Sequence, residues 1–175
     1  MIGDLKSVPR TALGSDAVML LRIVAVATLF GAQAIHVRAM SDHARVWPAA
    51  AAFFLVVAIA EGACGVWLVL APGHRAARVA IALSFATMAV WAMSRIVGMP
   101  IGPHPWIAEP FAVPDVISTG LEMTTAICLV AWMRRSEREA PLSRAGIAAA
   151  AFSLIVVASV TWVGLAAPGH LDLVR

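Results

Sequence analysis

Polar side chains recur at helical spacing inside apolar stretches of this sequence. Two sets have intervals of three or four residues, which place the members of each set on one face of a helix. The first set is Asp115, Ser118, Glu122 and Thr125, and the second is Ser84, Thr87, Trp91 and Arg95. A charge inside a membrane span costs about 2.5–3.5 kcal/mol, so it normally faces the interior of a helical bundle and finds a partner there. We therefore expect Arg95 to pair with Asp115 or Glu122.

Further ionisable residues are expected to join these two sets in one polar cluster. Its expected members are His36, Glu61, Arg95, Glu109, Asp115 and Glu122. Three interpretations stay open. The cluster could be structural, with a buried ion pair and hydroxyl groups that fix the order of the helices. It could line a pocket, open to the outside, for a cation, a metal ion or a small polar ligand. It could also form a proton or ion path through Glu61 and Glu122.

Histidines provide the only indication of a metal site. The candidate ligands are His36, His43 and His104, which are predicted on the same side of the membrane. Imidazole and carboxylate groups suit zinc or copper. No pair has a diagnostic ligand spacing, because His36 and His43 are seven residues apart across a helix end. A haem would need facing histidines within the membrane, and only His36 meets that condition. We predict no cofactor and leave a metal ion open.

Motifs of soluble catalysis are absent from the sequence. It contains no G-x-x-x-x-G-K-[ST], no G-x-S-x-G and no H-E-x-x-H. A carboxylate, arginine and histidine set could serve acid–base chemistry, but no nucleophile accompanies it. The sequence therefore favours a protein that is not an enzyme, and we predict no catalytic residue.

Composition indicates the class of protein. Apolar residues make up 61% of the chain and charged residues 13%, and the mean hydropathy is +0.88. A soluble domain carries about a quarter charged residues, whereas the apolar runs here reach about 20 residues, the length that crosses a bilayer. The net charge of +3 does not indicate nucleic acid, because the arginines cluster in short loops. We expect an integral membrane protein that binds no nucleic acid.

The apolar runs predict an all-α fold, a bundle of five transmembrane helices. The spans are expected at about 17–39, 47–71, 77–98, 115–134 and 145–167. Residues 1–16 are expected to form a cytoplasmic arm, and residues 17–175 a single transmembrane domain. Ala32-Gln33-Ala34 resembles a signal-peptide cleavage site, but we expect the first span to stay in the bilayer as a helix.

The positive charges predict the orientation of the spans. Cytoplasmic loops of membrane proteins carry the excess of Lys and Arg. With the N-terminus inside, the cytoplasmic segments hold Lys6, Arg10, Arg75, Arg78, Arg134, Arg135, Arg138 and Arg144. The outer segments then hold Arg38, Arg45, Arg95 and Arg175. We therefore expect the N-terminus inside and the C-terminus outside.

A proline-rich segment joins the third and fourth spans. Five of the ten prolines lie between Arg95 and Glu122, and proline excludes both a regular helix and a central strand there. The segment is too apolar for a disordered linker, so we expect a rigid extracytoplasmic cap over the bundle. The residues expected to shape this cap are Gly98, Pro100, Gly102, Pro103 and Trp106.

The same segment carries a resemblance. Its pattern is R-x-x-G-x-P-x-G-P from Arg95, then Glu109-Pro110, then an acidic pair seven apart, Asp115 and Glu122. It resembles a group of small multi-pass bacterial membrane proteins that have no established activity. The resemblance covers about the first four spans. It implies a bacterial inner membrane and one structural unit from Arg95 to Glu122, but no reaction.

The function expected from these observations is non-enzymatic. We expect an integral membrane binding or accessory protein, a subunit or partner of a larger membrane complex, with a polar pocket in the outer leaflet. Its partners would be the lipid bilayer and other membrane subunits or further copies of the chain. The alternative is a small transporter or a metal- or cation-handling protein that uses His36, Arg95, Asp115 and Glu122.

Overall fold

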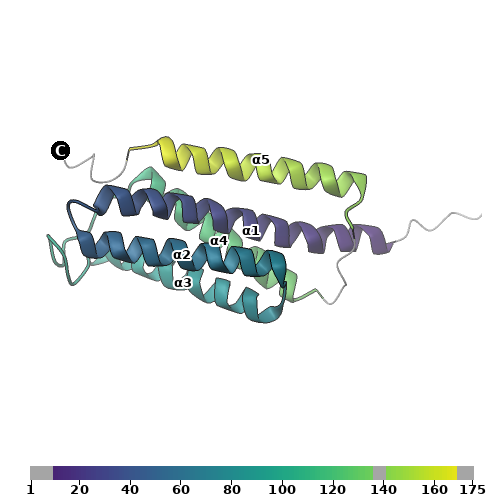
Figure 1. The fold of residues 1–175 in the computed structure, drawn as a ribbon, viewed down its shortest axis with the longest axis horizontal. Helices are drawn as coiled ribbons and strands as arrows, with labels where there is room; N and C mark the ends of the chain where they lie inside the picture. Colours follow the sequence, from purple (N-terminus) through teal and green to yellow (C-terminus); the bar gives the residue numbers. More distant parts are fainter. Residues whose placement is uncertain (1–9, 136–140, 169–175) are drawn as a thin grey trace, which may run out of the picture.

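Five long helices run back and forth through the computed structural model, which describes residues 10–135 and 141–168 (Figure 1). The helices are α1 (Arg10–His43), α2 (Pro48–Leu70), α3 (His74–Ile96), α4 (Val113–Met133) and α5 (Arg144–Ala166). The described residues contain no strand. All five helices are long and apolar enough to cross a membrane. The predictions of an all-helical fold and of five such helices are confirmed. Those made for residues 1–9, 136–140 and 169–175, including Lys6, Arg138 and Arg175, concern residues outside the described ranges.

The ends of the helices follow local sequence signals. Pro48 and Pro114 stand in the first turns of α2 and α4, where a missing backbone N–H costs no hydrogen bond. Pro72-Gly73 separates α2 from α3. Helix α1 extends beyond the expected first span at both ends, starting at Arg10 and ending at His43. No proline or glycine interrupts the chain between Ala39 and His43, so nothing local ends the helix earlier.

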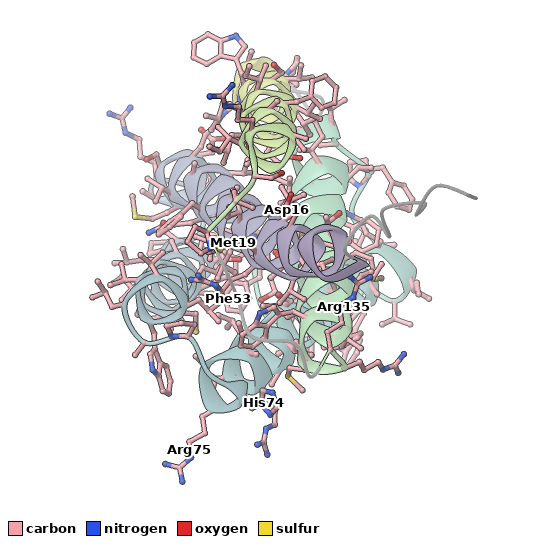
Figure 2. All side chains as sticks on the ribbon, turned by 90° about the vertical axis from the view of Figure 1, so that its right-hand side faces the viewer. Asp16, Met19, Phe53, His74, Arg75 and Arg135 are labelled. Atoms are coloured by element: carbon pink, nitrogen blue, oxygen red, sulfur yellow. The ribbon has the colours of Figure 1, made fainter. Side chains whose placement is uncertain are left out.

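Helix α1 lies in the middle of the bundle and contacts α2, α4 and α5. Helix α3 packs against α2 and α4 and completes a four-helix arrangement with α1. Seen along the helix axes, α5 lies on the side of α1 opposite to α3 (Figure 2). Close packing between α1 and its neighbours depends on glycines: a Cβ at Gly65 on α2 would lie 2.8 Å from the Phe30 ring, and one at Gly164 on α5 would lie 2.8 Å from Ile35.

Two charged residues of α1 hold the ends of α5. Asp16 accepts hydrogen bonds from the backbone N–H of Ser143, at 3.0 Å, and from its hydroxyl. Arg38 donates to carbonyls at the C-terminal end of α5, to that of Gly164 at 3.3 Å and to that of the capping residue Ala167 at 2.7 Å. Asp16 and Arg38 are 22 positions apart, about 33 Å along a helix, and α5 has 23 residues, about 35 Å. The anion therefore meets the positive end of the α5 dipole and the cation meets its negative end.

The α3–α4 segment, residues 97–112, folds back on the end of α3. The backbone N–H of Glu109 donates to the carbonyl of Ser94 at 3.0 Å. Gly98 has a φ of +79°, and a Cβ there would lie 2.5 Å from the backbone of Ile107. Only glycine fits that close approach with that backbone conformation. Gly102 has a φ of +119°, and a Cβ there would lie 2.7 Å from the ring of Trp47 in the α1–α2 loop.

Candidate functional site

A cavity of about 320 Å³ lies between α1, α2, α3 and α4 at the end of the bundle that carries the α1–α2 loop and the α3–α4 segment. Its ionisable lining residues are His36, Arg38, Asp42, His43, Arg95, Glu109, Asp115 and Glu122, and its aromatic ones are Trp47, Phe53, Phe54 and Trp91. Two arginines thus face four carboxylates in the lining. The cavity has a negative excess of charge inside aromatic walls.

One group of charges in the cavity, the outer cluster, consists of Arg95, Glu109 and Asp115. The Arg95 side chain is only 4% exposed, and its two terminal nitrogens donate to Glu109 Oε2 and to Asp115 Oδ2. The three residues come from the end of α3, the α3–α4 segment and the first turn of α4. The cation is thereby shared between two carboxylates that reach the edge of the cavity, and Glu122 is not among its partners.

A second group, the inner cluster, consists of His36 on α1, Glu61 on α2 and Glu122 on α4. His36 is 4% exposed, and Glu61 and Glu122 are each 1% exposed. His36 Nδ1 lies 2.9 Å from Glu61 Oε2, and His36 Nε2 lies 3.9 Å from Glu122 Oε1. One carboxylate oxygen of Glu61 and one of Glu122 lie within 4.8 Å of each other. Three helices far apart in the sequence therefore bring three ionisable groups together in the buried interior.

The inner cluster contains more acceptors than donors. Oε1 of Glu61 and Oε1 of Glu122 are buried and have no hydrogen-bond donor among the described residues. The tautomer of His36 decides which atom of its contact with Glu61 donates. When Glu61 is ionised it can only accept, so His36 Nδ1 then carries the proton, and the lone pair of Nε2 is directed toward Glu122 Oε1. Two acceptors that face each other in an apolar interior need a proton or a metal cation between them.

Beyond the inner cluster the bundle becomes apolar. The hydroxyl groups of Thr28 on α1 and Thr125 on α4 form a buried hydrogen bond of 2.8 Å. Next comes a core of buried apolar residues from all four helices: Ala25, Leu29, Cys64, Leu68, Ala76, Ala77, Ala80 and Leu129. This core separates the inner cluster from the opposite end of the bundle. The cavity therefore leads to a floor and does not continue as a polar channel through the described residues.

The structure disperses the three histidines proposed as metal ligands. His43 is buried, its Nδ1 donates to the carbonyl of Ala39 at 2.7 Å, and its ring lies 5.0 Å from that of Phe54. His104 is exposed on the α3–α4 segment. Among the described residues, the group whose metal-binding atoms converge is His36, Glu61 and Glu122.

Of two aromatic residues at the site, Trp91 was expected on the polar face of its helix, whereas Phe54 was not singled out from the sequence. Phe54 stacks on the His36 ring with a centroid distance of 5.8 Å, and the Trp91 indole Nε1, which is buried, has no hydrogen-bond partner among the described residues. Phe54 precedes Glu61 by seven residues on α2, two turns of the same helical face. That helical spacing from Glu61 was the signal in the sequence that could have identified Phe54.

Comparison of the chain with protein-family models, with curated proteins and with solved structures found no match.

Proposed function

We propose that this chain is a multi-pass membrane protein that binds a cation in its helical bundle. The observation that carries the proposal is the inner cluster, where the two buried glutamates beside His36 each have an oxygen without a donor among the described residues, and where His36 and Glu122 line the cavity. A buried carboxylate without a compensating charge is costly. A bound cation removes that cost, and the negative excess of the lining attracts cations into the cavity.

The topology proposed for the membrane places the cavity on the outer side. The loops and helix ends opposite the cavity hold Arg75, Arg78, Arg134, Arg135 and Arg144, whereas Arg38, Arg45 and Arg95 lie at the cavity end. This asymmetry supports an N-terminus inside and a C-terminus outside. The α3–α4 segment then caps the outer face, and its exposed Ile101, Trp106 and Phe111 suit the membrane interface. The proposal that this membrane is a bacterial inner membrane rests on the resemblance that the same segment carries.

Binding is favoured over conduction. A transport path needs polar groups across the whole thickness of the membrane, but the apolar core beyond Thr28 and Thr125 interrupts them. A cation that enters from the outer face therefore leaves by the same face unless the bundle rearranges. This supports the expected binding role over the alternative of a small transporter.

The test is binding of cations to the purified full-length protein in detergent. Trp47 and Trp91 line the cavity and report occupancy through their fluorescence. Titration with sodium, potassium, tetramethylammonium and zinc chlorides should show saturable binding of at least one cation. The double variant Glu61→Gln/Glu122→Gln should lose it. The matched control is Asp16→Asn, which removes a carboxylate at the opposite end of α1. If no cation in the series binds saturably, the proposed function is wrong.

A role as accessory subunit is the second candidate, and one observation favours it. Only 11% of the most apolar window of α5 is buried, against 33–39% for the other four helices. A helix with so little internal contact offers a face to a partner in the membrane, which includes a second copy of the chain. Cysteines introduced one at a time at Phe152 and Ile155, both exposed on α5, should then cross-link in native membranes. Labelling by lipid-soluble reagents alone would instead mean that lipid covers this face.

A further inference from the structure

We infer that His36, Glu61 and Glu122 hold a divalent transition-metal ion. The inference rests on the proposed function, because it names the class of cation that the inner cluster takes. One ligand atom from each of the three residues lies within 4.8 Å of the others. The residues are on α1, α2 and α4, so the site forms only when these helices pack together.

The spacing of the three groups fits a shared ion. Zinc and similar ions bind nitrogen and oxygen ligands at about 2.0–2.2 Å, which places two neighbouring ligand atoms about 3–4 Å apart. His36 Nδ1 and Glu61 Oε2, which lie 2.9 Å apart, can be neighbouring ligands of one ion when the ion replaces the proton between them. A carboxylate oxygen of Glu122 supplies the third ligand, since one ligand atom of each residue lies within 4.8 Å of the others.

The charge of the site selects a divalent ion. Glu61 and Glu122 are each 1% exposed and offer two negative charges to an ion when both are ionised, while Arg95 is held by Glu109 and Asp115. A monovalent ion would leave one buried negative charge uncompensated, whereas a divalent ion neutralises both carboxylates. Compensation of this kind is what a low-polarity interior requires.

The surroundings of His36 match those of a metal ligand. His36 Nδ1 is the ring nitrogen that faces Glu61, 2.9 Å from Oε2, so it is the nitrogen available to an ion that both residues bind. The Phe54 ring stacks on the imidazole and holds its plane.

The ligand set discriminates among metals. Magnesium and calcium prefer oxygen ligands alone, so an imidazole ligand favours zinc, cobalt, iron or manganese. Three protein ligands leave at least one coordination position of the ion unfilled, as in sites where a small molecule binds the metal. His36 and Glu122 both line the cavity, so this position faces the space through which such a molecule would arrive.

The experiment is a titration of the purified, metal-stripped, full-length protein with cobalt chloride. Cobalt bound to nitrogen and oxygen ligands of low coordination number gives visible absorption, which reports the ligands directly. We expect one cobalt ion per chain, displaced by zinc but not by a hundredfold excess of magnesium, calcium or sodium. His36→Ala, Glu61→Gln and Glu122→Gln should each weaken binding by more than about 100-fold, because loss of a ligand exceeds the 10–100-fold effect of its hydrogen-bonded supports.

The controls separate loss of the site from loss of the fold. Asp16→Asn and His74→Gln change a carboxylate and an imidazole at the opposite end of the bundle and should bind cobalt as the unaltered protein does. Glu122→Gln is nearly isosteric, and its helical circular dichroism and thermal midpoint without metal should be retained. Cobalt binding that survives Glu122→Gln and Glu61→Gln would overturn the inference. Saturable binding of sodium or tetramethylammonium without cobalt uptake would overturn the metal site but leave the cation proposal in place.

Discussion

The outer and inner clusters lie at the same cavity but differ in how their charges are compensated. In the outer cluster a built-in cation, Arg95, donates to two carboxylates that are 29% and 19% exposed. In the inner cluster two carboxylates of 1% exposure have one imidazole between them and acceptor atoms without donors. The outer cluster contains its own cation, although Arg95 Nε is buried without a partner among the described residues, whereas the inner cluster needs a proton or a cation to compensate its carboxylates.

The two clusters also differ in how they are assembled. Arg95 is 14 and 20 residues from its partners Glu109 and Asp115, and all three belong to the segment between α3 and α4 or to the adjoining helix ends. His36 is 25 residues from Glu61, and Glu122 comes from a helix two further along the chain. The local outer cluster holds the α3–α4 segment to the adjoining helix ends, whereas a cluster drawn from three helices depends on the packing of the whole bundle. The difference indicates a structural role for the outer cluster and a binding role for the inner one.

Removal of the built-in cation should have the largest effect on stability. Arg95→Ala leaves Glu109 and Asp115 facing each other without compensation, and we expect a loss of about 3 kcal/mol in the free energy of unfolding, since breaking a buried ion pair costs about 3–5 kcal/mol and these carboxylates are partly exposed. Thermal unfolding in detergent measures it. The triple variant Arg95→Met/Glu109→Gln/Asp115→Asn should recover most of the loss. An unchanged midpoint for Arg95→Ala would remove the structural role of the outer cluster.

Gly98→Ala should disturb the outer cluster but spare the inner one. The φ of +79° and the contact with the Ile107 backbone leave no room for a Cβ, so we expect a loss of about 2 kcal/mol from backbone strain. Gly120→Ala is the matched control, because a Cβ at Gly120 meets nothing within 4 Å. Cobalt binding should stay within about threefold in Gly98→Ala, since this strain energy does not involve the ligands. Loss of cobalt binding would show that the two clusters are coupled.

When no metal is present, Glu61→Gln should raise the free energy of unfolding, whereas Arg95→Ala should lower it. The amide oxygen still accepts from His36, and the amide N–H can donate to Glu122, so a repulsive contact becomes a hydrogen bond. We expect a gain of about 1 kcal/mol in metal-free protein, and a loss of the stabilisation that zinc gives the unaltered protein. Thermal unfolding with and without zinc measures both. A metal-free loss as large as that of Arg95→Ala would contradict the binding role of the inner cluster.

The smallest effect is expected from Thr125→Val, which removes an uncharged polar contact next to the inner cluster. The hydrogen bond of 2.8 Å between Thr28 and Thr125 joins α1 and α4, and such bonds between membrane helices are worth about 0.6 kcal/mol. The thermal midpoint should fall slightly, with cobalt affinity unchanged. A large drop in cobalt affinity would show that the hydroxyl groups of Thr28 and Thr125 belong to the metal site.

Much of the outer cluster could be predicted from the sequence. The pairing of Arg95 with Asp115 is one of the two that we considered, because both residues stand at helix ends joined by one short proline-rich segment. The choice between Asp115 and Glu122 could not be made, since it depends on how far α3 and α4 are displaced along each other. Glu109 was expected in the cluster, but its contact with Arg95 requires the turn that Gly98 permits.

Less of the inner cluster could be predicted from the sequence. His36, Glu61 and Glu122 were expected among the polar residues of the cavity because charges in apolar helices face the interior. The expected metal ligands, by contrast, were His36, His43 and His104. Helical spacing gives the face of each residue on its own helix but not the rotation of one helix relative to another. The meeting of His36 with two glutamates from α2 and α4, in place of two histidines, is a result of that rotation.

The sequence by itself determined the five apolar helices, because length and hydropathy are properties of a single segment and need no knowledge of its neighbours. The tertiary structure alone decided which charges meet. Arg95 and Glu122 lie within the same stretch of chain, yet they belong to different clusters. Side-chain contacts across a bundle depend on the offset and rotation of packed helices, which small residues such as Gly65 and Gly164 set through close approach. The offset and rotation of the helices therefore decide that Arg95 is paired with carboxylates, whereas Glu122 belongs to a cluster that needs a proton or a cation.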